Sequence, residues 1–156
     1  MALTTAQRTT LAAHIRANSD PTVAAALAVR NDNAIVTVYN ADSALLVWRT
    51  NIEPDEYRGA LDWTEVDNLT VGRARIWEWL TQNMTVSINA SKPNVRAGLN
   101  NAFNNTTTKT NLLAIANRLA TLAESIFADI AQSPGVLVFE GLITAEDVGR
   151  ALNDNP

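Results

Sequence analysis

Apolar residues recur every three or four positions over most of this chain, which is the spacing of amphipathic helices. The longest such run lies in the segment TKTNLLAIANRLATLAESIFADIAQ, roughly residues 108–131, where Leu112, Ile115 and Leu119 keep the register. Its apolar stripe is broad enough to be covered on more than one side. The pattern therefore predicts a mainly α protein, a small helical domain around this one central helix.

Prolines and capping residues divide the rest of the chain into shorter helices. Proline suits the first turn of a helix because its missing N–H has no partner there, and Ser, Thr and Asp accept from the free N–H groups just before it. The candidate helix starts are Thr4 or Thr5, Ser19 or Asp20 with Pro21, Asp32, Pro54, Asp67 or Thr70, Ser91–Pro93 and Thr144 with Asp147.

Extended structure is predicted in two places and left open in a third. ALLVW, ending at Trp48, has the composition of a strand, and VLVFEGLI, at 136–143, reads as a strand or hairpin arm after the SPG turn. The segment AIVTVY, residues 34–39, fits a helix and a strand equally well. With no long linker and no repeat, we expect a single domain over 1–156 with an extended arm at about 134–143.

Composition restricts the functional classes. The 156 residues carry a formal net charge of −4, no cysteine and one histidine, His14, so disulfides, thiolate sites and sites with two histidines from one chain are excluded. Lys92 and Lys109 are the only lysines, which disfavours nucleic acid as a main ligand. No signal peptide and no membrane-spanning run is recognised.

One carboxylate cluster could carry chemistry. Glu53, Asp55, Glu56 and Asp62 can supply the acid pair of a glycan hydrolase. The alternative is that Asp55 and Glu56 simply stabilise the first turn of a helix opened by Pro54. No phosphate-binding loop, nucleophile motif or metal-ligand spacing occurs, so we expect no enzyme, no cofactor and no metal site.

Tryptophan and arginine concentrate in the middle of the chain and indicate either a core or a subunit contact. Both residue types are enriched at protein interfaces. Trp77 and Trp79 point to opposite sides of one helix, and we expect Trp79 inside and Trp77 at the interface. The predicted interface residues are Trp48, Arg49, Arg58, Trp63, Arg73, Trp77, Val136, Val138, Phe139 and Leu142.

Three segments together resemble a known family. They are VWRTNIEPDEYRGALDWTEVDNLTVGRARIWEWL, NASKPNVRAGL and VFEGLITAEDVGRAL. Their order and spacing are similar to those of small virion structural proteins of tailed bacteriophages, over roughly residues 3–152. The resemblance is to whole segments and includes no catalytic motif.

This resemblance implies a head–tail adaptor, also called a connector or neck protein. Such proteins form a homo-oligomeric ring, most often a dodecamer, that contacts the portal and other neck or tail proteins. The expected location is the virion, after assembly in the host cytoplasm, with nucleic acid met only as the genome passes through the ring. Capsid decoration and tail-end proteins are the alternatives within the same class.

Overall fold

The computed structural model describes residues 3–104 and 106–154, and these residues are mainly α-helical with one small sheet. They form two compact units. Unit 2 is the continuous segment Leu46–Arg118, and unit 1 consists of the described residues on both sides of it. The sequence predicts a single domain, whereas each unit has a hydrophobic core of its own.

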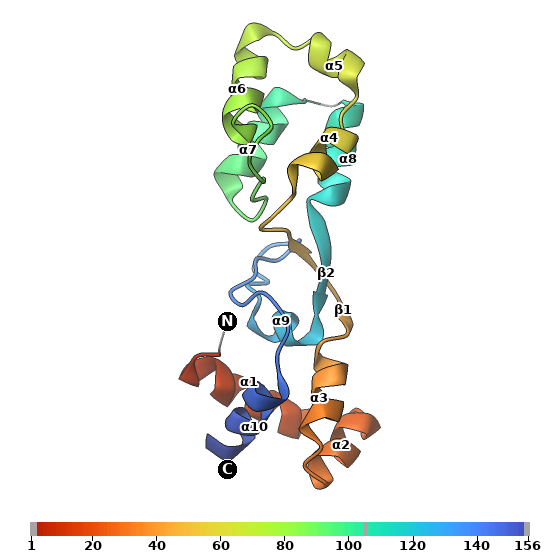
Figure 1. Ribbon diagram of the computed structural model, residues 1–156, viewed down its shortest axis with the longest axis vertical. Helices are drawn as coiled ribbons and strands as arrows, with labels where there is room; N and C mark the ends of the chain where they lie inside the picture. Colours follow the sequence, from red (N-terminus) through yellow and green to blue (C-terminus); the bar gives the residue numbers. More distant parts are fainter. Residues whose placement is uncertain (1–2, 105, 155–156) are drawn as a thin grey trace. The chain divides into compact units, whose positions relative to one another are not determined.

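Unit 1 brings the first and last helices of the chain together (Figure 1). Its helices are α1 (Thr5–Ala17), α2 (Pro21–Ala28), α3 (Asp32–Tyr39), α9 (Leu122–Phe127) and α10 (Ala145–Asp154). α10 packs against both α1 and α3, and Leu11, Ile15 and Val148 are buried between them. The side chain of Asn40 fixes the chain before α10, donating to Ile143 O at 2.9 Å and accepting from Ile143 N at 3.0 Å.

Unit 2 is built around three aromatic rings. Its helices are α4 (Pro54–Gly59), α5 (Trp63–Asp67), α6 (Val71–Thr81), α7 (Pro93–Ala102) and α8 (Thr107–Ile115). Trp77 of α6 meets Tyr57 and Phe103 edge to face, with ring centroids 5.6 and 5.1 Å apart. α6 and α7 approach closely at Gly98, where a Cβ would lie 2.9 Å from Leu80 Cδ1. A side chain at that position would therefore require the Leu80 side chain to move.

The sheet consists of β1 (Asp42–Trp48) and β2 (Asn117–Thr121), which pair antiparallel. β1 leads the chain out of unit 1 and β2 leads it back. The pairing continues at both ends, where Arg49 N donates to Ala116 O and Leu122 N donates to Ala41 O, each at 2.9 Å. The predicted extended segment ALLVW is thereby confirmed as part of β1.

The predicted central helix over 108–131 is wrong. Its residues form α8, then β2, then α9. Thr121 and Glu124 explain the restart, because each side chain accepts a hydrogen bond from the other's backbone N–H, at 3.1 and 2.9 Å. This capping box begins a new helix. The apolar periodicity continues through both breaks in the helix, so it does not reveal them.

The segment at 134–143 contains no strand. Its extended pairing is limited to bridges at Gly135 and Val136, and at the second of these Val136 and Asp129 exchange backbone hydrogen bonds of 2.9 and 2.7 Å. The small sheet that the protein does have lies at β1 and β2 instead. The ambiguous residues 34–39 lie in helix α3, which Asn31 caps by accepting from Ala34 N at 3.2 Å.

Candidate functional site

A pocket in unit 2 lies between α7 and α8, beside the end of β1. Its volume is about 170 Å³. The residues that line it are Trp48, Ala90, Arg96, Leu99, Asn100, Lys109, Leu112, Leu113 and Ala116. Most of these side chains are apolar, and the charged ones, Arg96 and Lys109, are both cations. No carboxylate contributes to the lining.

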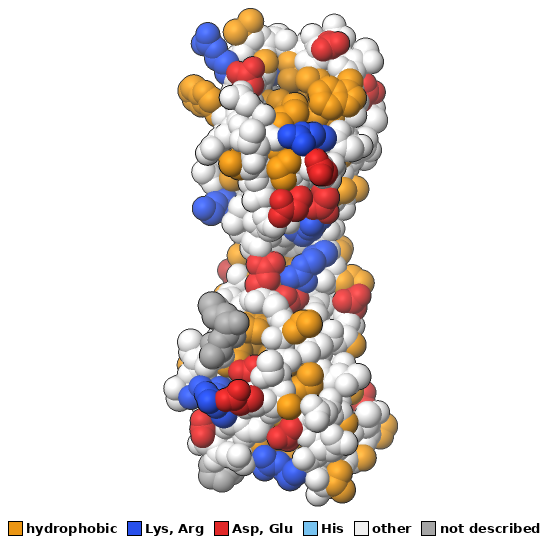
Figure 2. Space-filling view, viewed as in Figure 1, with side chains coloured by type: hydrophobic (Ala, Val, Ile, Leu, Met, Phe, Trp, Pro, Cys, Tyr) orange, Lys and Arg blue, Asp and Glu red, His pale blue; other side chains and the backbone are white. Residues whose placement is uncertain are grey.

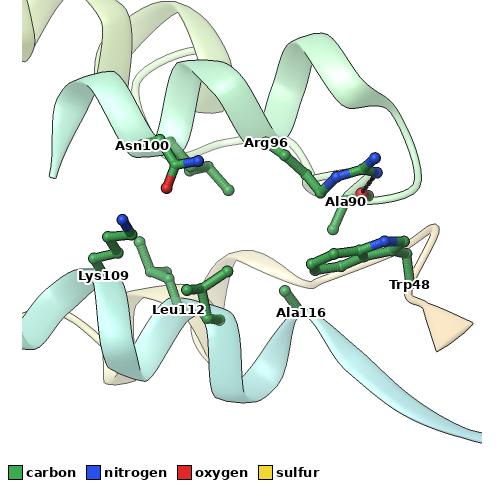
Figure 3. Close-up of a pocket in the computed structure, with 9 residues that line it drawn as sticks. Trp48, Ala90, Arg96, Asn100, Lys109, Leu112 and Ala116 are labelled. Carbon is green, nitrogen blue, oxygen red and sulfur yellow. Dashed lines mark hydrogen bonds between the residues drawn. The ribbon is translucent and has the colours of Figure 1, made fainter. Parts of the chain in front are cut away.

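Trp48 and Arg96 close one end of the pocket (Figure 3). The Arg96 guanidinium lies 4.6 Å from the centre of a Trp48 ring, within the range of a cation–π contact. Its Nη1 also donates to the backbone carbonyls of Ala90 and Ser91, both at 2.8 Å. Arg96 is thus held in place, and it fixes the indole that forms this wall.

Lys109 and Asn100 form the opposite end, where Figure 3 shows their side chains facing each other across the gap between α8 and α7. Neither the Lys109 ammonium nor the Asn100 amide forms a hydrogen bond or ion pair with any described residue. The ammonium has three donors and the amide has donors and an acceptor. This end can therefore bind a polar or anionic group.

Small residues leave the space open. Ala90 and Ala116 are buried beside the Trp48 ring, and each leaves empty a space that a larger side chain would fill. Ala116 directly follows the last turn of α8, and Leu112, one turn earlier, forms the apolar floor. Because these residues are small, a space about the size of one ring remains next to the Trp48 indole.

A wider and more open hollow lies in unit 1, beside His14, Asn18 and Asp20. The Tyr39 hydroxyl holds two of these residues, at 2.8 Å from His14 Nδ1 and 3.2 Å from Asn18 Nδ2. Burial raises the pKa of Tyr39 above its ordinary value. These polar groups satisfy one another within the unit.

The carboxylate cluster at 53–62 serves to hold helices. Glu56 pairs with Arg49 through two hydrogen bonds of 2.7 and 2.8 Å, and this pairing lowers the pKa of Glu56. Asp62 caps α5, with its Oδ1 accepting from Thr64 N at 2.9 Å. Asp55 bonds to Arg58 at 3.0 Å, and Glu53 accepts from the Asn51 side chain. Asp55 and Glu56 thus lie in the first turn of α4 as the helix-start interpretation expects, and Asp62 begins a second helix, α5.

The two tryptophans of α6 are placed opposite to expectation. Trp77 is 3% exposed and forms the centre of the unit 2 core, whereas Trp79 is 80% exposed. Among the other predicted interface residues of this region, Trp63 and Arg73 are exposed and Trp48 is half-buried in the pocket wall. Trp77 is therefore buried within unit 2, and Trp79 is the exposed tryptophan of α6.

The arginines Arg49 and Arg58 act inside unit 2. Arg49 binds Glu56 and also donates to Ile115 O and Asn51 O, both at 3.2 Å. Arg58 donates to Met84 O as well as to Asp55. Both guanidinium groups thus connect α4 to neighbouring segments of the same unit.

The four predicted contact residues at 136–142 divide into two kinds. Val138 and Leu142 are 66% and 67% exposed, so both remain available for contact. Phe139 is 2% exposed and stacks edge to face on Phe127, with centroids 5.6 Å apart. Val136 is half-buried. Phe139 belongs to the core of unit 1 and is not exposed for contact, unlike Val138 and Leu142.

Within residues 3–104 and 106–154, no group of three or more His, Cys, Asp or Glu side chains could hold a metal ion. No helix in the same ranges is long and apolar enough to cross a membrane. No protein-family model, curated protein or solved structure matches this chain. The likeness to bacteriophage head–tail proteins therefore stays a prediction from the sequence motifs.

The sequence prediction names Trp48 as an interface residue, not as a pocket wall, and does not name Arg96, Asn100, Lys109 or Leu112. These residues come together only because α7 packs near α8, and no local pattern encodes that contact. The one available signal was the rarity of lysine, since Lys109 is one of only two in the chain.

Proposed function

We propose that this chain is a non-enzymatic virion structural protein of the head–tail connector type, which assembles as a homo-oligomeric ring between portal and tail. The motif resemblance supports the virion role. The structural observation that supports assembly is the outer face of α6. There Val71, Arg75 and Trp79 follow one another at intervals of four residues.

Residues spaced by four lie on one side of a helix. Val71 and Trp79 are 71% and 80% exposed, and Arg75 between them is exposed as well. The opposite side of α6 carries Trp77 and is already covered by the core of unit 2. Large apolar side chains beside an arginine are the composition of an interface centre, so the outer face is suited to bind a protein. Figure 2 shows hydrophobic side chains at the surface of this part of unit 2.

A ring requires two different surfaces on each subunit, because one copy's front meets the next copy's back. The second surface that we propose lies on the connection between α9 and α10. Ile130, Val138 and Leu142 are exposed there, at 66–69% of their surface. Each unit would thus contribute one of the two contact surfaces.

The test is assembly of variants in which each surface is made polar. Trp79→Asp on one surface and Val138→Asp with Leu142→Asp on the other should each give a folded protein that no longer forms rings, as seen by native mass spectrometry. Val29→Asp is the matched control, because Val29 is 74% exposed but lies outside both surfaces. Normal rings from both variants would contradict the assembly model.

Location in the particle separates the connector from the decoration alternative. Purified virions should contain about twelve copies, the number that the resemblance to dodecameric adaptors implies, situated at the neck. Hundreds of copies over the capsid surface would instead support a decoration protein. Copies confined to the far end of the tail would support a tail-end protein.

A further inference from the structure

We propose that the pocket between α7 and α8 binds a small monocarboxylic acid whose apolar body is about the size of one six-membered ring. The proposal is independent of ring assembly, since it rests on the residues of one pocket in one unit. It assigns a ligand-binding site to a region for which the motif resemblance implies none.

Size gives the first constraint. An apolar protein cavity of about 150 Å³ accommodates benzene and otherwise stays dry. The pocket here has about 170 Å³, with the Trp48 ring on one side and Leu99 and Leu112 among its other walls. One ring or one branched aliphatic group fills this space, with a little room for a polar substituent.

Charge gives the second constraint. Lys109 is partly buried, and its ammonium has no partner among the described residues. Asn100 faces it from α7, so two sets of hydrogen-bond donors converge on the same end of the pocket. With two cations and no carboxylate in the lining, an anion is favoured and an amine is repelled. A carboxylate at this end, with its apolar body toward Trp48, satisfies both constraints.

The lining disfavours the terminal residue of a peptide, which offers a similar carboxylate. A peptide also brings a backbone amide into the site, and that group needs its own hydrogen-bond partner. Arg96 already donates to two backbone carbonyls and covers the indole. Asn100 is then the one uncharged polar side chain in the lining that could bind such an amide. The pocket therefore suits a free acid better than the end of a peptide.

Benzoate is the probe, and lysine itself supplies the readout. Protein labelled with ¹³C-lysine has two ε-methylene signals in an NMR spectrum, one from Lys109 and one from the exposed Lys92. Benzoate should shift the Lys109 signal saturably and leave Lys92 unmoved. Benzamide, which keeps the ring but lacks the charge, should bind at least about tenfold more weakly, and benzylamine should not bind.

Two variants separate the charge from the cavity. Lys109→Gln should weaken benzoate binding by at least about tenfold, measured by the tryptophan indole shifts, while the matched Lys92→Gln should leave it unchanged. Ala116→Leu should abolish binding of every probe because its side chain fills the space beside Trp48. If Ala116→Leu does not fold, the lysine pair still tests the proposal, because neither lysine belongs to the core.

Several results would overturn the proposal. Equal affinities for benzoate and benzamide would remove the role of Lys109, and equal shifts of both lysines would indicate nonspecific binding. Absence of any saturable shift would show that the cavity is not a ligand site. Tighter binding of N-acetyl-phenylalanine than of benzoate, lost in the corresponding amide, would replace the free acid with a peptide C-terminus.

Discussion

Unit 1 and unit 2 bury their apolar side chains in different ways. Unit 1 has a mainly aliphatic core that depends on contacts between the beginning and the end of the chain, such as α1 with α10. Unit 2 is one continuous segment whose core centres on Tyr57, Trp77 and Phe103. Unit 2 also holds the pocket beside Trp48, whereas the hollow described in unit 1 is wider and more open. The difference indicates that unit 2 carries the candidate ligand site and unit 1 joins the chain ends.

The tryptophans make the two units distinguishable in solution. All four, at positions 48, 63, 77 and 79, belong to unit 2. Tryptophan fluorescence therefore reports unfolding of unit 2, while far-ultraviolet circular dichroism reports the helices of both. Changes made in one core can be followed separately from changes in the other.

Trp77→Ala should have the largest effect. It removes the central ring of unit 2 and leaves a cavity between Tyr57 and Phe103, at a cost of about 3–5 kcal/mol in the free energy of unfolding. Urea unfolding monitored by circular dichroism measures this loss in the free energy of unfolding. Trp79→Ala, two residues away and 80% exposed, is the control and should change stability by less than about 0.5 kcal/mol. Similar losses in both variants would contradict the aromatic centre.

Ile15→Ala should destabilise unit 1 by about 2–5 kcal/mol, because Ile15 is fully buried in its core. The part of the circular dichroism transition that reports unit 1 should move to lower urea, and the fluorescence transition of unit 2 should stay in place. Thr10→Ala, on the exposed side of the same helix, is the control. A common shift of both signals would show that the units unfold as one, which would contradict two separately perturbed cores.

Glu65→Gln should have the smallest effect, confined to acid. The Glu65 carboxylate accepts from Thr108 N and Thr107 N at the start of α8, both at 2.8 Å, and these bonds, chiefly those of Thr108, lower its pKa to about 2. Because the folded pKa is depressed, the stabilisation is complete above the unfolded pKa and disappears as pH falls toward 2.

Urea midpoints by fluorescence from neutral pH down to acid measure this effect. Wild type should lose stability as pH falls through that window, and Glu65→Gln should lose less. Asp67→Asn serves as the control because Asp67 is exposed and lies on the same helix. Parallel profiles for wild type and Glu65→Gln would contradict the anchoring role.

Local chemistry predicted several of the helix starts, although Lys92 and Asn31, not Ser91 and Asp32, are the N-caps of α7 and α3. Thr4 caps α1 in a box with Gln7, Pro21, Pro54 and Pro93 begin α2, α4 and α7, and Thr144 exchanges hydrogen bonds with Asp147 before α10. These signals are read from neighbouring residues. They require no knowledge of what the helix packs against.

Pairing and packing could not be predicted in the same way. Residues 117–121 adopt a strand because β1 is available to pair with them, although their own pattern continues that of a helix. Trp77 is inside because α7 and α4 cover that side of α6, whereas either tryptophan fits the periodicity. The pocket was missed for the same reason, since its walls come from three separate segments.

The paired strands have a consequence for the order of folding during synthesis. β1 and β2 hold the two ends of unit 2 together, so unit 2 is an insertion within unit 1. The N-terminal half of unit 1 leaves the ribosome first but must wait for α10 to complete its core. If unit 2 folds before α10 is synthesised, the two ends of the segment between the halves of unit 1 are already close together. Much of the entropic cost of joining those halves has then been met.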